Sequence, residues 1–221
     1  MNMKLRLIVM NFLQYAIWGS YLTSMGTYLV GAGLSSNIGI FYATQGIVSL
    51  FMPAIIGIVA DRWIQAQRLL GLCHLLAAAF MVATGYYALN APTVEFATLF
   101  TLYSCSVAFY MPTLGLSNSV AYSSLTKAGL DTVKHFPPIR VWGTVGFICA
   151  MWCCDLAGFQ ASAWQFLQSA AIGIVLGLYS FTMPQCPTNK GGEKKSFAEA
   201  LGLNAFALFK QKKMALFFIF S

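Results

Sequence analysis

Long apolar runs dominate this sequence and limit what it can fold into. Six of them are long enough to cross a bilayer as helices, which takes about 20 residues each. Short segments that hold nearly all the charged residues separate these runs. A chain with this pattern is expected to form an all-α membrane protein. The six runs cover residues 5–30, 38–60, 69–89, 95 to 119 or 121, 138–155 and 163–183.

The composition argues against several other classes of protein. Of the 221 residues, 58% are hydrophobic and 9% are charged, whereas soluble domains have about 25% charged residues. The net charge of +7 does not indicate a nucleic-acid partner, because the basic residues lie between the apolar runs. The six cysteines lack the paired spacing of a metal site, so we expect no metal and no cofactor. No nucleophile–base pair or glycine-rich phosphate loop is present, so we do not expect an enzyme.

Lysine and arginine residues fall on one side of the predicted spans. They precede the first span, lie between the second and third and between the fourth and fifth, and follow the sixth; Arg140 is the exception. The other connecting segments offer only Glu95 and Asp155. Because positive charge favours the cytoplasmic side, the amino terminus is expected in the cytoplasm.

The sequence changes character after residue 183, where the six-helix bundle of residues 1–183 is expected to end. Residues 184–213 are interpreted as a cytoplasmic linker with a short amphipathic helix, because Ser196 and Glu199 form a capping box. Residues 214–221 are apolar but too few to cross about 30 Å of hydrocarbon. They are interpreted as the truncated start of a seventh span, which makes the chain the first half of a twelve-span protein.

One polar segment lies between the second and third spans. Gly57, Asp61 and Arg62 form a G-x-x-x-D-R pattern, and Arg68 follows. This pattern resembles the cytoplasmic signature of the major facilitator superfamily. The resemblance implies a conformational latch, in which Gly57 lets a neighbouring helix approach and Asp61 pairs with a basic residue. The alternative is an ordinary charged loop that anchors the second span.

Arg140 and Thr144 share one face of the fifth span. They are four residues apart, about 6 Å along a helix axis. An arginine in the middle of a membrane helix costs about 2.5 kcal/mol or more, so its presence suggests a function. Pro137 and Pro138 suit a helix start, which would place Arg140 in the first turn. The alternative is that Arg140 reaches back to the lipid headgroups.

Several longer stretches form distinctive patterns: FLQ at 12–14, WGS at 18–20, GTY at 26–28, YMPTLGL at 110–116, FPPIRVWGTVGF at 136–147, and LGL and AFALFK within 201–210. Together they resemble bacterial nucleoside:proton symporters, a branch of the major facilitator superfamily. The resemblance implies that the chain is the amino-terminal half of an inner-membrane transporter that carries nucleosides inward with protons, and that a carboxy-terminal half is missing.

A nucleoside site needs hydrogen-bonding side chains and an aromatic face. Arg140 and Thr144 are expected, from the resemblance, to contact the substrate. Gln14 and Trp18 share a face of the first span and are further candidates, as is Asn118 in the fourth. The alternative for these three is packing between helices.

No carboxylate lies in the middle of a predicted span. A proton-coupled carrier usually needs an ionisable group there, so the proton acceptor is expected in the missing half. His74 and His135 are interpreted as structural. Two other functions stay open: a carrier of another small polar solute such as a sugar, and a membrane scaffold or receptor that does not transport.

Overall fold

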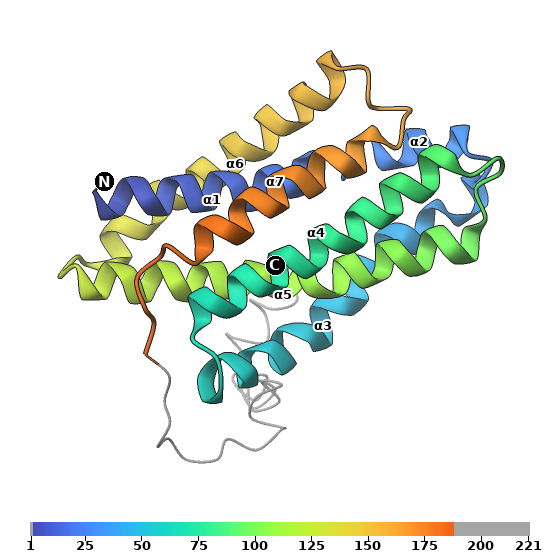
Figure 1. Ribbon diagram of the computed structural model, residues 1–221. Coiled ribbons are helices and arrows are strands. Elements are labelled where there is room, and N and C mark those ends of the chain that lie inside the picture. Colours follow the sequence, from blue (N-terminus) through green and yellow to red (C-terminus); the bar gives the residue numbers. More distant parts are fainter. Residues whose placement is uncertain (1, 188–221) are drawn as a thin grey trace, which may run out of the picture.

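The computed structural model describes residues 2–187, except for the side chains of Asp61 and Arg62. This part of the chain consists of α-helices and one short 3-10 helix, and it contains no strand (Figure 1). The elements are α1 (Met3–Gly19), α2 (Met25–Gly31), η1 (Ser35–Asn37), α3 (Ile38–Arg62), α4 (Ala66–Asn90), α5 (Phe96–Lys127), α6 (Thr132–Leu156) and α7 (Trp164–Ser180).

Four helical segments are long and apolar enough to cross a membrane by length and composition: Ser35–Ala60, α4, α5 and α6. Helix α7, which lies in the sixth predicted span, has 17 residues. The predicted first span is not one continuous helix, because α1 and α2 are separated by a turn at residues 20–24.

The turn between α1 and α2 is stabilised by side chains from other helices. Ser169 Oγ donates to the carbonyl oxygen of Ile17 at 2.9 Å, and Tyr42 Oη donates to that of Leu22 at 2.8 Å. Ser24 Oγ donates to Gln165 Oε1 at 2.9 Å. Backbone groups released by a helix break need such partners in an apolar environment. The break depends on these distant partners, which explains why the apolar run did not reveal it.

Helix α6 begins earlier than the proline pair predicted. Its N-cap is Asp131, whose carboxylate accepts a hydrogen bond from the backbone N–H of Val133 at 2.9 Å. Pro137 and Pro138 therefore lie inside the helix, and the prediction that they start it is wrong. Arg140 is the ninth residue of α6 and lies in its third turn. The cap at Asp131 outweighed the preference of proline for a first turn.

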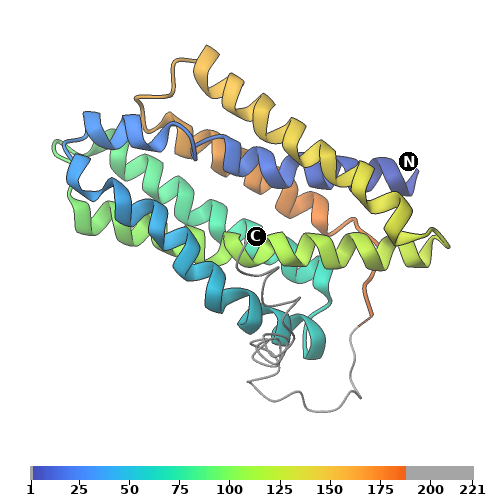
Figure 2. The same ribbon diagram turned by 180° about the vertical axis from the view of Figure 1, so that it is seen from behind.

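The helices pack with an internal symmetry. Helix α1 packs mainly on α6 and α7, while α5 packs mainly on α3 and α4, and α4 also packs on α7. The first three spans (α1–α2, α3, α4) correspond in order to the last three (α5, α6, α7). When each span is replaced by its counterpart, every one of these contacts becomes a contact of the same set. Helices α3 and α6 accordingly lie at the outside of the bundle, as the two opposite views show (Figures 1 and 2).

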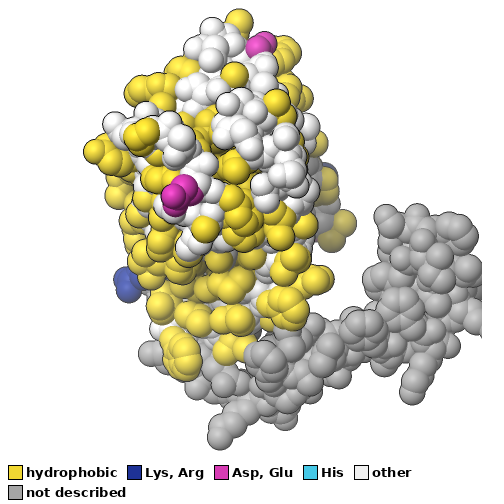
Figure 3. Space-filling view, turned by 90° about the vertical axis from the view of Figure 1, so that its right-hand side faces the viewer, with side chains coloured by type: hydrophobic (Ala, Val, Ile, Leu, Met, Phe, Trp, Pro, Cys, Tyr) yellow, Lys and Arg dark blue, Asp and Glu magenta, His cyan; other side chains and the backbone are white. Residues whose placement is uncertain are grey.

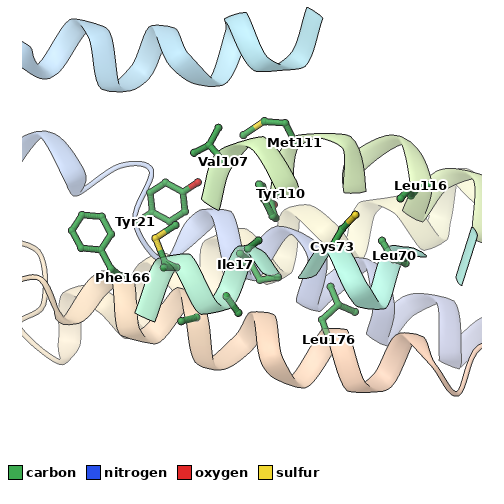
Figure 4. Close-up of a cluster of buried hydrophobic side chains, with 14 of the residues drawn as sticks. Ile17, Tyr21, Leu70, Cys73, Val107, Tyr110, Met111, Leu116, Phe166 and Leu176 are labelled. Atoms are coloured by element: carbon green, nitrogen blue, oxygen red, sulfur yellow. The ribbon is translucent and has the colours of Figure 1, made fainter. Parts of the chain in front are cut away.

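The hydrophobic core lies where α1, α4, α5 and α7 meet. Tyr21, Tyr110 and Phe166 are almost completely buried there, together with aliphatic side chains from all four helices (Figure 4). The outer helices expose large apolar side chains instead, including Phe51 on α3 and Trp152 on α6. Such faces need lipid or protein to cover them.

Charge is segregated between the two ends of the bundle. Glu95 and Asp155 lie at the end formed by α2 and the α4–α5 and α6–α7 loops, where acidic side chains are visible in Figure 3. Among the described side chains, the basic residues other than Arg140 lie at helix ends that face the opposite side: Lys4, Arg6, Arg68, Lys127 and Lys134.

The expected linker and the expected seventh span mostly lie outside the described residues. This applies to residues 188–213, with the capping box at Ser196 and Glu199, and to residues 214–221.

Candidate functional site

Helices α1 and α6 cross with their backbones in contact. A methyl group added at Gly146 would overlap the carbonyl of Phe12, and one added at Gly19 would overlap the backbone of Phe147. Helices in membranes approach this closely only where small residues face each other. The crossing therefore places the segment of α6 around Arg140 to Phe147 directly against α1.

Arg140 lies against an aromatic ring of α1. Its Cζ atom is 3.8 Å from the centroid of the Tyr15 ring, which is a cation–π contact. Such contacts stabilise by about 0.5–2 kcal/mol. A methyl group at Gly143 would come within 2.5 Å of Tyr15 Cδ2 and 2.9 Å of Arg140 Nη1. The Tyr15 ring and the Arg140 guanidinium thus both pack against Gly143, three residues further along α6.

Arg140 and Thr144 lie deeper along their helix than the sequence suggested. Thr144 is the thirteenth of the 25 residues of α6 and is exposed. Arg140 is half-buried and lies about 12 Å along the axis from the first residue of the helix. Both side chains are therefore available on the same face near the middle of α6.

Two further aromatic side chains meet across the same helix crossing. Phe147, one turn beyond Thr144, meets the Trp18 ring edge-on, with centroids 6.4 Å apart. Trp18 Nε1 donates to Gln45 Oε1 at 2.8 Å, and Gln45 Nε2 donates to Tyr103 Oη at 2.8 Å. Because these bonds join α1 to α3 and α5, the orientation of the Trp18 ring is determined by three helices.

Gln14 lies on the other side of α1, fully buried in a polar network. Its Nε2 donates to Thr113 Oγ1 at 2.8 Å, and its Oε1 accepts from His74 Nε2 at 2.9 Å. Tyr110 Oη also donates to the Gln14 carbonyl at 2.7 Å. These bonds connect α1 to α4 and α5. Gln14 therefore makes the contacts between helices that were its alternative interpretation.

Asn118 is half-buried on α5, two turns beyond Tyr110. Its Oδ1 is buried and has no hydrogen-bond partner within the described part of the chain. No hydrogen bond between described residues joins it to Arg140 or Thr144. The structure thus pairs Arg140 with Tyr15 and Trp18 with Phe147 across the α1–α6 crossing. Thr144 lies on the same face of α6 as Arg140.

The predicted latch residues lie at the end of α3 and the start of α4. A methyl group added at Gly57 would meet nothing within 4 Å, so no described helix approaches it closely. Arg68 is exposed in the first turn of α4. The side chains of Asp61 and Arg62 lie outside the described part of the structure. The latch stays a prediction.

Tyr15, Gly143 and Phe147 were missed as candidates, although the sequence held a signal for them. On α6, residues 140, 143, 144 and 147 follow the spacing of one helical face. Tyr15 lies three residues before Trp18, also within reach of one face. Extending the Arg140–Thr144 pair along its face would have identified Gly143 and Phe147.

Enclosed space inside the bundle is too small for an organic ligand. A cavity of about 10 Å³ lies between α1, α4, α5 and α7 and is lined in part by His74, Tyr110 and Ser169. Small-molecule sites are usually about 300–1,000 Å³. An open groove of about 390 Å³ lies between α5 and α6, lined by Tyr122, Thr132, Val133, Phe136 and Pro137. Of these two spaces, only the groove between α5 and α6 has the volume of a small-molecule site.

Residues that could hold a metal are not grouped. No cluster of three or more histidine, cysteine or acidic side chains occurs in the described part of the chain. The acidic residues there, Asp61, Glu95, Asp131 and Asp155, all lie within two residues of a helix end.

These features define a class: a multi-pass helical membrane protein with a polar, aromatic-lined site at a helix crossing, as in membrane transporters. The family description "Nucleoside H+ symporter" matches residues 1–221. The chain belongs to this family.

Characterised relatives agree with this assignment. The chain is 44% identical to the nucleoside permease NupG of Escherichia coli K12 and 42% identical to the xanthosine permease of the same organism, over 223 residues in each case. Each comparison covers 100% of this chain and 52% of the relative. The chain thus spans about half the length of the curated relatives it matches.

A crystal structure of a mutant of the nucleoside transporter NupG matches the fold with a TM-score of 0.87 and 42% identity. It covers 99% of this chain, which covers 54% of that structure. A second NupG crystal structure matches with a TM-score of 0.81. The expected fold class, an all-α half of a transporter, is confirmed.

Proposed function

We propose that this chain is the amino-terminal half of a nucleoside–proton symporter and that it has no enzymatic activity. The observation that carries the proposal is the cluster at the α1–α6 crossing. There, Arg140 packs on the Tyr15 ring, and Phe147, three residues after Thr144, packs on the Trp18 ring. Membership of the nucleoside H+ symporter family supports both the substrate class and coupling to protons.

The chemistry of the cluster fits a nucleoside. The guanidinium of Arg140 donates to ribose or base oxygens, and the Thr144 hydroxyl both donates and accepts. Phe147 and Trp18 offer apolar rings against which a planar base stacks. Thr144 is exposed, so the substrate occupies the surface of α6 and is enclosed there by the carboxy-terminal half. Gln14 and Asn118 support the site from the surrounding helices.

Transport follows from alternating access. The two halves rock about the shared site, and Gly57, Asp61, Arg62 and Arg68 act as the latch at the α3–α4 loop. The proton acceptor lies in the carboxy-terminal half, because the described acids of this chain lie near helix ends. In a variant that has every buried acidic residue of that half replaced by its amide, we expect no substrate-driven proton uptake. Proton uptake in that variant would refute this location.

The experiment that tests the function compares substrates. The complete transporter in proteoliposomes, with an inward-directed pH gradient, is expected to accumulate labelled uridine and to lose accumulation when a protonophore is added. Unlabelled uridine competes, whereas glucose does not. Uptake of glucose without uridine would support the alternative sugar carrier, and uptake of neither would favour a scaffold or receptor.

A further inference from the structure

The guanidinium of Arg140 is held by a ring instead of a carboxylate. Within residues 2–187, its one recorded partner is Tyr15, with Cζ 3.8 Å from the ring centroid. Arginine carries five N–H donors in the plane of the guanidinium. One ring and one hydroxyl on Tyr15 can take up only part of these five donors, so the others remain available to a ligand.

Tyr15 is itself held in place on both sides along α1. One residue earlier, Gln14 is bonded to Thr113 and His74. Three residues later, Trp18 is bonded to Gln45. The segment of α1 that carries Tyr15 is thereby connected to α3, α4 and α5.

The opposite side of the contact is formed by α6 itself. Gly143 leaves room for both groups, since an added methyl would lie 2.5 Å from Tyr15 Cδ2 and 2.9 Å from Arg140 Nη1. Any larger residue at position 143 would push the guanidinium away from the ring. The position of Arg140 therefore depends on one residue of α1 and one of α6.

From this geometry we propose that Tyr15 is a positioning residue for nucleoside binding: its ring holds the Arg140 guanidinium so that the N–H edge faces the substrate. The proposal rests on the proposed function, because it requires Arg140 to bind the nucleoside. It assigns Tyr15 a role through Arg140, without contact to the substrate. The role is assigned to the ring, and a variant that keeps the ring measures what the hydroxyl adds.

The test measures uridine affinity and maximal uptake rate with the complete transporter. Tyr15→Leu is expected to raise the Kd and the KM for uridine about threefold to thirtyfold, the range that a lost cation–π contact corresponds to, with the maximal rate changed less than twofold. Tyr15→Phe keeps the ring and is expected to stay within twofold of wild type. Tyr87→Leu, a half-buried tyrosine on α4, is the matched control and should leave the affinity unchanged.

A double-mutant cycle separates positioning from general damage. In an Arg140→Gln background, Tyr15→Leu is expected to change the Kd less than twofold, because the guanidinium is already absent. If Tyr15→Leu fails to fold, Tyr15→Met replaces it, since methionine fills a similar space without a ring. Equal losses in both backgrounds, or no loss in either, would overturn the positioning role alone. Wild-type affinity in Arg140→Gln would instead overturn the substrate site and this inference together.

Discussion

At the scale of single residues, Arg140 determines the character of the site. A charged side chain at mid-helix costs about 2.5–3.5 kcal/mol in a membrane, and the contact with Tyr15 offsets part of this. Its depth in α6 argues against the alternative that it serves only to reach the headgroups. A buried carboxylate would have neutralised the charge, but it would also have occupied the donors that a nucleoside needs.

Individual residues differed in how well the sequence predicted them. The spacing of Arg140 and Thr144 correctly placed them on one helix face, because that depends only on helix geometry. The burial of Gln14 and the Trp18–Gln45 bond depend on which helices neighbour α1, and spacing does not contain this information. The proline pair misled for a different reason: the cap at Asp131 is a local hydrogen bond, and it starts the helix before the prolines.

At the scale of elements, the α1–α6 crossing creates the site. The existence of the helices could be predicted from apolar length alone, but their pairing could not. Gly19 and Gly146 are the residues that allow this particular pairing, because the backbone of the other helix occupies the space of a side chain at each. The break between α1 and α2 was likewise invisible, since its carbonyl partners Ser169 and Tyr42 come from distant segments.

Substitution of the glycine at the crossing should separate the two helices. Gly146→Ala places a methyl group on the Phe12 carbonyl. Overpacking of this kind costs about 1–3 kcal/mol, so the melting temperature of the complete transporter should fall by about 5 °C. Uridine affinity should fall with it, because the site spans the crossing.

Gly39→Ala on α3 is the control for that substitution. A methyl group at Gly39 meets nothing within 4 Å, and alanine favours a helix over glycine. Its melting temperature should match or exceed that of wild type. An unchanged melting temperature in Gly146→Ala would contradict close packing of α1 on α6.

At the scale of the whole molecule, the fold of this chain matches about half of a transporter structure. The exchange symmetry of the helix contacts places α3 and α6 at the outside, with apolar faces that include Phe51 and Trp152. The curated relatives are about twice as long as this chain, and we propose that a second half covers these faces. Charge segregation was predicted from the loops, and the structure confirms that the basic helix ends lie together.

The orientation that we propose puts the basic end in the cytoplasm of a bacterial cell and the bundle in its inner membrane. In a cysteine-free version of the complete transporter, Gln160→Cys in the α6–α7 loop should react with a membrane-impermeant maleimide in intact cells. Lys134→Cys at the start of α6 should react only after lysis. The reverse pattern would place the amino terminus outside.

Uridine binding to the purified complete transporter tests the central claim most directly, because binding requires the α1–α6 site but no coupling. By isothermal titration, Arg140→Ala is expected to raise the Kd at least about tenfold, since a hydrogen bond from a charged group is worth about 1.5–3 kcal/mol. Lys134→Ala, an exposed basic residue on the same helix, should leave the Kd unchanged. A folded Arg140→Ala variant that binds uridine as tightly as wild type would contradict the account.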